Sequence, residues 1–591
     1  MNSLPALARS PSLALFRFRG VGRSTNRIAA VCLLLSFVAF VSFCSSSRAN
    51  TATGDKGIAA TVHPIATEAA INAFKRGGNA IDAAVAAALT LGVVDGHNSG
   101  VGGGCFMLIR LAGGKVVAID GREMAGAAAT RNMFLRDGKA DTLLSQTGPL
   151  ASAVPGALAA YAYAMKSFGK LKLSDHLEAA AGVADAGFKL DSNYVRKIAA
   201  VAGALQSFPA SDAIFFKHDG SPYREGDVFR QRDLARSYRA LARDGIKWFY
   251  DGPFAKAAAK WMHEHGGILT EDDFRNYSLE LREPILTAYR SYKIVSFPPP
   301  SSGGVHVAEI LNILETRDLK QFKPGSADLI HFVTEAMKLA FADRAHWLGD
   351  PAFAPVPRGL VSKPYAISLS TKIKMDHAAN VEGHGTPERA HDDIFGKHTT
   401  HFSTADAEGN WVACTATINT AFGSKVVVPG TGIVLNNQMD DFSTQPGVPN
   451  AFKLVGAEAN AVAPGKRPLS SMSPTIVLKE GQPILAVGAA GGPTIISQTL
   501  LALVNVLDYG MTLEDALKAP RWHHQWSPDE LKIESKAGDA VLKELEARGH
   551  KLSKSPGFGA CNGVMRNRTG EGFVGVNDPR VPGAAKGFDP E

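Results

Sequence analysis

The chain has 591 residues, 45% of them hydrophobic and 20% charged, a composition typical of a globular protein with large apolar cores. Its formal net charge is +7, but residues 1–49 contain six arginines and no acidic residue, so the remainder carries only +1. Because the basic character belongs to the N-terminal segment, composition gives no support to nucleic-acid binding, and we expect no nucleic-acid partner.

The first 49 residues have the order of a secretory signal. Arginines precede an apolar run at residues 29–43, and Ser47-Arg48-Ala49 offers small residues for cleavage. Two serines interrupt the run, which is shorter than the roughly 20 residues that a spanning helix needs. We therefore expect a signal peptide at 1–49 and an exported protein, periplasmic or extracellular. A retained N-terminal membrane anchor is the alternative.

The cysteines and histidines do not form a recognisable metal or disulfide pattern. Beyond residue 49 only Cys105, Cys414 and Cys561 remain, an odd number at wide spacing, so we expect buried free thiols. The histidine pairs at 263–265 and 523–524 lack the i, i+4 spacing of a helical zinc site. No metal and no cofactor is expected.

The N-terminal third alternates helical and strand patterns. Thr67-Glu68 opens a predicted helix that ends at Gly77-Gly78, and Asn79 with Asp82 forms a capping box for a second helix to about residue 94. Residues 105–110 and 116–120 are predicted strands of a hairpin around Gly113-Gly114. Helical patterns dominate from 152 to about 344. Residues 376–398 are polar, without apolar periodicity, and predict a solvated loop.

A second predicted hairpin follows that loop. Strands at 401–405 and 411–419 flank a turn at 406–410. If the turn is centred on Glu408, Thr399 lies opposite Thr417 and His401 opposite Thr415. Opposed side chains in an antiparallel pair lie about 4.5–5.5 Å apart at Cβ, which is close enough for one hydroxyl to orient another. A slip of one residue would destroy this register.

A third hairpin, at 474–478 and 483–487, leads into a glycine-rich segment and a predicted helix at 495–508. Neither Gly102-Gly103-Gly104 nor Gly491-Gly492 fits a phosphate-binding or dinucleotide-binding loop. Tight turns explain both runs. For Gly491-Gly492 an oxyanion hole made of backbone N–H groups is the functional alternative.

The polar loop brings threonines to the start of a predicted strand. A threonine hydroxyl is a weak nucleophile until a base takes its proton, and a chain cut just before the threonine supplies its own α-amino group as that base. The nucleophile-elbow sequence Gly-x-Ser-x-Gly is missing from the chain. These residues predict an enzyme that generates its own active site.

A series of ordered motifs resembles the γ-glutamyltranspeptidase family. The motifs are Gly102-Gly-Gly-Cys-Phe-Met107, Arg122-Glu-Met-Ala125, Pro298-Pro-Pro-Ser-Ser-Gly-Gly304, Thr399-Thr-His-Phe-Ser403, Asn436-Asn-Gln-Met-Asp-Asp-Phe-Ser443, Lys466-Arg-Pro-Leu-Ser-Ser-Met-Ser-Pro474 and Ala519-Pro-Arg-Trp-His-His-Gln-Trp526. The resemblance implies an α/β protein of the N-terminal nucleophile hydrolase superfamily, with a four-layer αββα sandwich. It also implies a proenzyme that cuts itself between His398 and Thr399. The products would be a large subunit of 50–398, ending in the flexible segment 376–398, and a small subunit of 399–591, together forming a heterodimer.

The resemblance assigns roles to individual residues. Thr399 would be the nucleophile, hydrogen-bonded by Thr417, with Gly491 and Gly492 as oxyanion donors. The remaining predicted residues would bind the α-carboxylate and α-ammonium groups of glutathione or another γ-glutamyl compound: Arg122, Ser470 and Ser471 for the carboxylate, and Asp441, Gln438 and Asn419 for the ammonium. The acceptors would be water, amino acids or peptides.

One departure and two rival functions remain. Residues 445–457 resemble the substrate-covering lid of many members, but Phe452 stands where relatives often have a tyrosine that bonds the asparagine matched by Asn419. We therefore expect a more mobile lid and a larger share of hydrolysis.

The rival functions are a cephalosporin acylase, which removes a glutaryl group, and an uncut exported protein that binds γ-glutamyl compounds or amino acids without chemistry. Arg122 and Asp441 together argue against the acylase, because only an amino-acid head needs both charges recognised.

Overall fold

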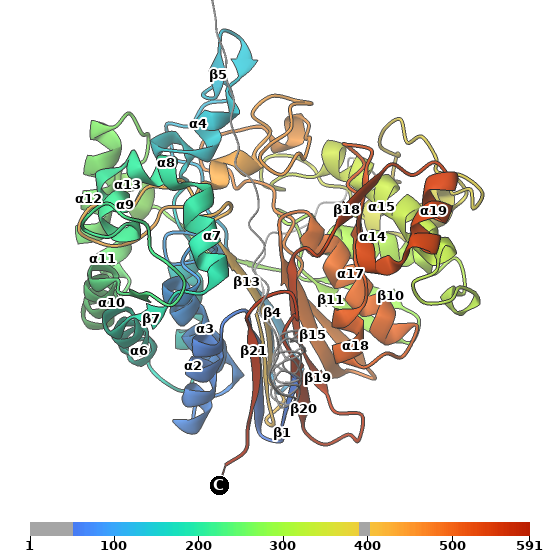
Figure 1. Ribbon diagram of the computed structural model, residues 1–591, viewed down its shortest axis with the longest axis horizontal. Helices are drawn as coiled ribbons and strands as arrows, with labels where there is room; N and C mark the ends of the chain where they lie inside the picture. Colours follow the sequence, from blue (N-terminus) through green and yellow to red (C-terminus); the bar gives the residue numbers. More distant parts are fainter. Residues whose placement is uncertain (1–50, 389–401, 591) are drawn as a thin grey trace, which may run out of the picture. The chain divides into compact units, whose positions relative to one another are not determined.

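The computed structural model describes residues 51–388 and 402–590, all within one compact unit, Ala49–Glu591. The predicted leader, and His398, Thr399 and His401, lie outside these residues. Two seven-stranded antiparallel sheets form the centre (Figure 1). In order across the first sheet the strands are β1 (Thr51–Gly54), β20 (Phe573–Val576), β19 (Ala560–Arg566), β15 (Gln482–Ala490), β14 (Thr475–Lys479), β11 (Tyr292–Ser296) and β10 (Ile285–Tyr289).

The second sheet also has seven strands. It contains the hairpin predicted in the N-terminal third and the hairpin predicted after the polar loop. Its strands are, in order, β21 (Ala584–Phe588), β2 (Gly57–Thr61), β12 (Ser403–Asp406), β13 (Trp411–Thr417), β3 (Gly104–Arg110), β4 (Val116–Gly121) and β9 (Glu280–Arg282). Both sheets therefore mix strands from before and after residues 389–401.

Helices cover the outer face of each sheet (Figure 1). On the second sheet lie α2 (Pro64–Lys75), α3 (Ala80–Val94) and α5 (Ala157–Phe168), backed by α6 (Leu173–Ala186), α10 (Arg232–Asp244) and α12 (Pro253–Glu264). On and beyond the first sheet lie α14 (Gly303–Leu314), α15 (Ala327–Trp347), α16 (Lys363–Ser370), α17 (Thr494–Leu507), α18 (Leu513–Lys518) and α19 (Asp539–Ala547). The prediction of a four-layer αββα sandwich is confirmed.

Shorter elements connect these layers. They are α4 (Thr142–Gln146), α7 (Ser192–Ala200), α8 (Ala202–Gln206), α9 (Pro209–Phe215), α11 (Lys247–Tyr250), α13 (Glu271–Arg275), the ribbons β5 (Leu135–Arg136) with β6 (Lys139–Ala140) and β7 (Phe188–Lys189) with β8 (Val228–Phe229), and a small sheet of β16 (Trp522–His523), β17 (Leu531–Glu534) and β18 (Leu552–Ser555). In the described part of the chain we find no helix with the length and apolar composition that crossing a bilayer requires.

Apolar side chains from the inner faces of the two sheets interdigitate. Phe106 of β3 stacks on Phe297, which follows β11, with ring centroids 5.0 Å apart, and Trp411 of β13 meets the edge of Phe573 of β20. These side chains are buried, as the interior of a sheet-on-sheet sandwich requires. The three cysteines are also buried and free, as predicted.

The hairpin of β12 and β13 has the predicted register. Ser403 pairs with Ala413 and Ala405 with Trp411, so the turn is centred on residue 408. The capping box of α3 is also present, because Asn79 accepts from the Asp82 backbone while the Asp82 side chain accepts from the Asn79 N–H. Local polar signals therefore predicted these elements well.

Two predictions of elements were wrong. The first helix, α2, begins at Pro64 rather than near Thr67, because Pro64 fits the first helical position and His63 Nδ1 accepts from the Ile65 backbone at 3.2 Å. The region predicted as mainly helical also contains the hairpin of β10 and β11. Its buried and exposed residues alternate along β10, but the strand is only five residues long, a weak signal between long helices.

Candidate active site

Thr417 lies at the end of β13, opposite Gly104 of β3. Its Oγ1 accepts the Asn419 backbone N–H at 2.8 Å, and Asn419 has a left-handed φ of 78°. The Asn419 side chain donates from Nδ2 to the Asn437 carbonyl at 2.9 Å. Two predicted site residues are thus joined directly, and both are tied to the segment that carries Gln438 and Asp441.

The Gly102-Gly103-Gly104 segment fits against this end of the hairpin. A Cβ on Gly103 would lie 2.0 Å from the Thr417 carbonyl oxygen, and a Cβ on Gly104 would lie 2.2 Å from Glu123 Oε2. The interpretation of this run as a tight turn alone was therefore incomplete. Glycine is needed there because backbone and side-chain atoms approach too closely for any other residue.

Arg122 and Asp441 form a buried ion pair. Arg122 Nη2 donates to Asp441 Oδ2 at 2.6 Å, and Nε donates to the Pro468 carbonyl at 3.0 Å. Burial raises the pKa of the Asp441 carboxyl, an effect that Arg122 opposes. The structure therefore brings the two predicted charges, which come from distant parts of the chain, into direct contact.

The two predicted serines follow Pro468 in the chain and are held by the proline-rich segment before α14. The Ser470 backbone N–H donates to the Pro300 carbonyl at 2.8 Å, while its carbonyl accepts from Ser302 N and Oγ at 2.8 and 2.7 Å. Ser471 Oγ accepts from Arg344 Nη2 at 3.3 Å. The motif at residues 298–304, which precedes the expected cleavage site, thus positions two serines that follow this site.

Arg344 was not predicted as a site residue. It lies at the C-terminal end of α15, is 6% exposed, and donates from Nε to Ser302 Oγ at 3.1 Å. Burial lowers the pKa of its guanidinium to about 10, while nearby Asp441 acts in the opposite direction. Within residues 51–388 and 402–590 it makes no ion pair, so a buried cation beside Ser471 lacks an anionic partner.

Several buried polar atoms around the ion pair make no hydrogen bond within the described residues, although Arg122 Nη1 and Glu123 Oε2 form a longer ion pair at 3.5 Å. These atoms include Arg122 Nη1, both carboxylate oxygens of Glu123, the side-chain amide of Gln438 and Asn437 Nδ2. Burial also raises the pKa of the Glu123 carboxyl to about 7, with Arg122 opposing the shift. Buried polar groups in proteins are nearly always hydrogen-bonded. So many buried atoms without a hydrogen bond in one place indicate that a ligand or bound water supplies the missing partners.

Gly491 and Gly492 connect β15 to α17 with φ values of 134° and 60°. A Cβ on Gly492 would lie 2.7 Å from the Phe452 ring, so the predicted lid residue packs against the predicted oxyanion donor. The Ala451 backbone N–H donates to Asp440 Oδ2 at 2.9 Å. The lid segment therefore links the glycine pair to the neighbour of Asp441.

Comparison with known proteins agrees with this geometry. The model of the gamma-glutamyltranspeptidase family matches residues 66–588. The glutathione hydrolase proenzyme of Escherichia coli (strain K12) is 43% identical over 532 residues, which cover 89% of this chain and 90% of that protein. The chain belongs to the gamma-glutamyltranspeptidase family.

Solved structures related to this gamma-glutamyltranspeptidase family member support the fold. The crystal structure of cephalosporin acylase from Bacillus halodurans has a TM-score of 0.83 and 29% identity, covering 93% of this chain and 99% of that one. The crystal structure of Helicobacter pylori gamma-glutamyltranspeptidase has a TM-score of 0.53 and 39% identity, covering 54% of this chain and 92% of that one. The predicted N-terminal nucleophile hydrolase fold and the prediction of an enzyme of γ-glutamyl transfer and hydrolysis are confirmed.

Within this gamma-glutamyltranspeptidase the described contacts join most of the predicted residues in two groups. Thr417 and Asn419 meet the loop before Gln438, and Arg122 meets Asp441 and the segment of Ser470 and Ser471. The glycine pair is connected to them through the lid segment. Glu123 stands inside the motif Arg122-Glu-Met-Ala125, but no role was predicted for it. Arg344 was missed because nothing in its local sequence sets it apart, and only the fold brings it beside Ser471.

Proposed function

We propose that this enzyme cuts itself between His398 and Thr399 and then uses Thr399 to cleave the γ-glutamyl bond of glutathione and related compounds. The acceptors of the γ-glutamyl group are water, amino acids or peptides. The mature protein is a heterodimer of residues 50–398 and 399–591. The observation that carries this proposal is the Arg122–Asp441 pair beside Ser470 and Ser471, which lies next to the loop that holds Asn419 and Gln438.

Maturation and catalysis use the same hydroxyl. The Thr399 oxygen attacks the His398 carbonyl carbon, and the C–N bond breaks as the ester forms, which frees the Thr399 amine. Water then hydrolyses the ester, which restores the Thr399 hydroxyl and leaves a carboxylate on His398. An α-amino group has a pKa of about 7.7–8.0, so near neutral pH it accepts the hydroxyl proton without help from a side-chain base. The hydroxyl then attacks the γ-carbonyl carbon to form a γ-glutamyl ester, and the departing amine takes the proton.

Backbone groups stabilise the charge that develops. In this proposal the N–H groups of Gly491 and Gly492 donate to the tetrahedral oxyanion, and the positive φ of both residues aims them away from the regular sheet direction. Loss of one such donor in other enzymes costs about 2.7–4 kcal/mol of transition-state stabilisation. Phe452 lies against Gly492 and forms an apolar wall beside this position.

The amino-acid head of the donor is bound by opposite charges. Its carboxylate meets Arg122, Ser470 and Ser471, and we add Arg344, which already donates to Ser471 Oγ. Its ammonium group meets Asp441, with Gln438 and Asn419 as neutral partners. A zwitterion entering the Arg122–Asp441 pair exchanges one ion pair for two, so the buried charges remain compensated.

The proposed enzyme is exported, with residues 1–49 as a signal peptide and a periplasmic or extracellular location. The retained anchor is the alternative for the same segment. N-terminal sequencing of the protein from intact cells and from culture medium distinguishes them. A large subunit that starts near residue 50 supports a cleaved signal, whereas one that starts near residue 1 in the membrane fraction supports the anchor.

Mass spectrometry of purified protein tests the self-processing. We expect two chains from the wild type, one of them beginning at Thr399, and a single inactive chain from Thr399→Ala. Thr400→Ala is the matched control, because it removes the neighbouring hydroxyl and should still be cut. A Thr399→Ala variant that is cut at the same bond would overturn the proposal, and an uncut wild type that retains ligand would support the non-catalytic binder.

An acylase is the second candidate function, because the structurally similar Bacillus halodurans protein, with a TM-score of 0.83, is a cephalosporin acylase. The two functions differ in whether the donor carries an α-ammonium group. We expect fast turnover of γ-glutamyl anilide and little of glutaryl anilide, and Asp441→Asn should narrow that difference. The opposite preference in the wild type would favour the acylase.

A further inference from the structure

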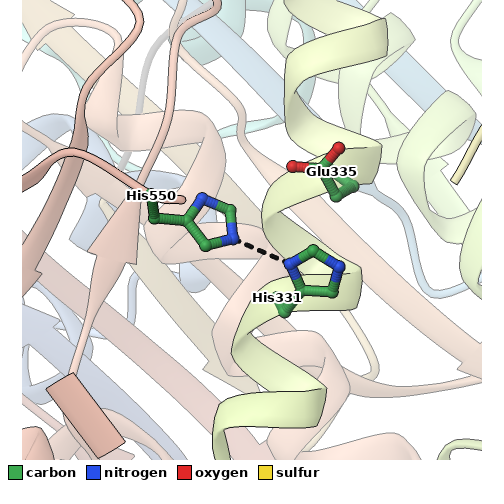
Figure 2. Close-up of side chains that lie close together, drawn as sticks. All are labelled: His331, Glu335 and His550. Carbon is green, nitrogen blue, oxygen red and sulfur yellow. Dashed lines mark hydrogen bonds between the residues drawn. The ribbon is translucent and has the colours of Figure 1, made fainter. Parts of the chain in front are cut away.

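A second cluster of buried ionisable side chains lies outside the proposed active site. His331 and Glu335 project from successive turns of α15, and His550 faces them from the connection between α19 and β18 (Figure 2). All three are at most 5% exposed, and their nearest ligand atoms lie within 4.8 Å of one another. The spacing of four residues on one helix, which the other histidine pairs lack, puts His331 and Glu335 on the same helix face.

The proton positions on His331 follow from its partners. Its Nε2 lies 2.7 Å from the Lys374 carbonyl oxygen, which only accepts, so Nε2 carries the hydrogen. Nδ1 therefore presents a lone pair, and it lies 2.8 Å from His550 Nε2. Histidines that bind metals usually donate their other ring N–H to a carbonyl or carboxylate in this way, which fixes the ring orientation.

The contact between the two rings bears on their protonation. His331 Nδ1 and His550 Nε2 are 2.8 Å apart with one hydrogen between them, so one of these two nitrogens carries no proton. Neutral imidazole is the ligand form of histidine. The charged and titratable groups that face the cluster are Lys338 and Glu335 on α15, Arg548 after α19, and His524 with Asp529 after β16.

Glu335 retains acceptor capacity although both of its oxygens are hydrogen-bonded. Lys338 Nζ donates to Oε1 at 2.9 Å, and the Ala379 backbone N–H donates to Oε2 at 2.9 Å. An ionised carboxylate offers about four acceptor positions, so coordination does not require either donor to leave. Lys338 also donates to the Ala379 carbonyl, which holds its charge beside the cluster and should weaken cation binding.

We propose that His331 Nδ1, His550 Nε2 and a Glu335 oxygen bind one divalent transition-metal ion of the zinc class. Two imidazoles and one carboxylate suit zinc and its neighbours better than magnesium or calcium, which prefer oxygen ligands. Two nitrogens at about 2.0–2.1 Å from one tetrahedral ion lie about 3.3 Å apart, so the two rings, now 2.8 Å apart, need to separate by about half an ångström. On binding, the His550 proton moves from Nε2 to Nδ1 through solvent, so no net proton is released.

The position of the cluster indicates what an ion would do. The segment just before residue 389 is bonded to it on both sides, since Lys374 accepts from His331 and Ala379 contacts both Glu335 and Lys338. The Ala378 backbone N–H also donates to the Arg548 carbonyl at 2.7 Å. A metal ion would therefore fasten this segment, α15 and the α19–β18 connection together. If the chain is cut as proposed, the ion joins the two subunits.

A cavity lies beside the cluster. A surface cavity of about 340 Å³ is lined by Glu335, Ala379, Val381 and His384, among others. Glu335 thus borders both the cavity and the histidine pair. The proposal does not depend on Thr399 or on any residue of the proposed catalytic site.

The test uses the purified full-length protein. Metals are removed with a chelator, the protein is desalted, and Zn²⁺ is then added. We expect one Zn²⁺ per chain to be retained through gel filtration, measured by elemental analysis, and a thermal midpoint that rises by a few degrees with Zn²⁺. Co²⁺ should give visible absorption bands typical of imidazole coordination. Unprocessed Thr399→Ala should bind equally, which separates this result from the proposed function.

Variants locate the ion. His550→Gln and Glu335→Gln should weaken Zn²⁺ binding by roughly 100-fold or more, at or above the upper end of the 10- to 100-fold typical of outer-shell changes. His384→Ala, which removes an exposed histidine at the cavity, is the matched control and should bind normally. Lys338→Gln should bind more tightly because it removes the neighbouring positive charge. The proposal is overturned if the wild type retains no Zn²⁺, or if His550→Gln and the wild type bind alike.

Discussion

Two buried clusters of arginines and carboxylates in this protein are built differently. One, the closed cluster, lies near the C-terminal ends of β17 and β20. It consists of Arg521, Glu534, Asp578 and Arg580. The other, the site cluster, consists of Arg122, Glu123, Arg344 and Asp441. Both contain two cations and two anions from distant parts of the chain, so composition does not distinguish them.

The closed cluster satisfies itself. Arg580 donates from Nε and Nη2 to the two oxygens of Glu534 at 2.5 and 2.8 Å, and from Nη1 to Asp578 Oδ1 at 3.2 Å. Arg521 pairs with Asp578 Oδ2 at 2.5 Å, and the Cys561 backbone N–H donates to the same oxygen. Among the residues that the structure describes, no side-chain atom of this cluster is buried without a partner.

The site cluster leaves polar atoms without hydrogen bonds to other described residues, and its Arg122–Glu123 ion pair is long, at 3.5 Å. Arg122 Nη1 and both oxygens of Glu123 have no hydrogen bond in the described part of the chain, and Arg344 has no carboxylate partner there. A satisfied network stabilises the fold, whereas unsatisfied groups destabilise it unless a ligand binds them. The difference separates a charge cluster that is satisfied within the fold from one that is free to hydrogen-bond a ligand, as proposed for this site.

The largest effect should follow from breaking the closed cluster. Arg580→Met leaves Glu534 buried without its main partner, and removing one member of a buried ion pair typically costs about 3–5 kcal/mol. We expect the free energy of unfolding, measured by urea denaturation, to fall by this amount. Arg568→Met, which changes an exposed arginine on the neighbouring loop, should have little effect. Equal stability of the two variants would contradict the contrast between the clusters.

Removing a cation from the site cluster should affect binding instead of stability. Arg344→Met deletes a guanidinium that has no carboxylate partner, so we expect unfolding to be unchanged or slightly more difficult. A hydrogen bond to a charged group contributes about 1.5–3 kcal/mol, so KM for a γ-glutamyl anilide should rise by roughly 10- to 100-fold with a smaller change in kcat. Arg344→Lys should recover part of the loss. A drop in stability at constant KM would assign Arg344 to the structural class.

The two clusters should also respond to pH in opposite directions. The folded pKa of Glu123 is raised from 4.5 to about 7, mainly by burial, so its contribution to stability is lost as pH rises from about 4.5 through about 7. Glu123→Gln should therefore become more stable than the wild type over this window, by on the order of 1–3 kcal/mol, and the difference should level off above pH 7. Urea denaturation at several pH values measures it.

Glu534 provides the counterpart in that experiment. Burial is the largest single influence and tends to raise its pKa, but Arg580, Lys536 and the Arg521 backbone N–H together outweigh burial and hold the pKa below the usual value of 4.5. Its stabilising contribution is therefore present above pH 4.5 and is lost as the pH falls further. Glu534→Gln should be less stable than the wild type at neutral pH and approach it in acid. The same pH trend for both variants would remove the distinction.

The smallest effect should come from the lid, which changes access to the site cluster without changing its charges. Phe452→Tyr adds a hydroxyl that can donate to the Asn419 side-chain oxygen, a bond whose net value is about 0.5–1.5 kcal/mol. We expect the ratio of transpeptidation to hydrolysis to rise roughly 2- to 10-fold in product analysis with an added acceptor peptide. Phe452→Leu is the control and should not increase the ratio. An unchanged ratio in Phe452→Tyr would refute the lid hypothesis.

Local signals predicted much of the fold. The Asn79–Asp82 capping box and the turn centred on Glu408 depend on neighbouring residues, so the sequence alone specified them. The start of α2 was missed because His63 is an unusual cap, and β10 was missed because a short strand between long helices gives little periodicity.

Site prediction depended on motif order and failed where only folding creates the neighbourhood. Arg122 and Asp441 were found through the family resemblance, and the structure adds that they bind each other. Arg344 resembles other basic residues near a helix end, and it becomes notable only because Ser471, 127 positions away, accepts its hydrogen bond. His331 and His550 are likewise 219 positions apart.

The interleaving of strands has a consequence for how the cut protein regains its structure. Five strand pairings, β1–β20, β11–β14, β2–β12, β3–β13 and β2–β21, join the chain before residues 389–401 with the chain after them. An uncut precursor refolds as one molecule, at a rate independent of concentration. Once the chain is cut in that segment, the two fragments must first collide, and refolding becomes second order. Dilution should therefore slow renaturation of the cut protein while leaving that of Thr399→Ala unchanged.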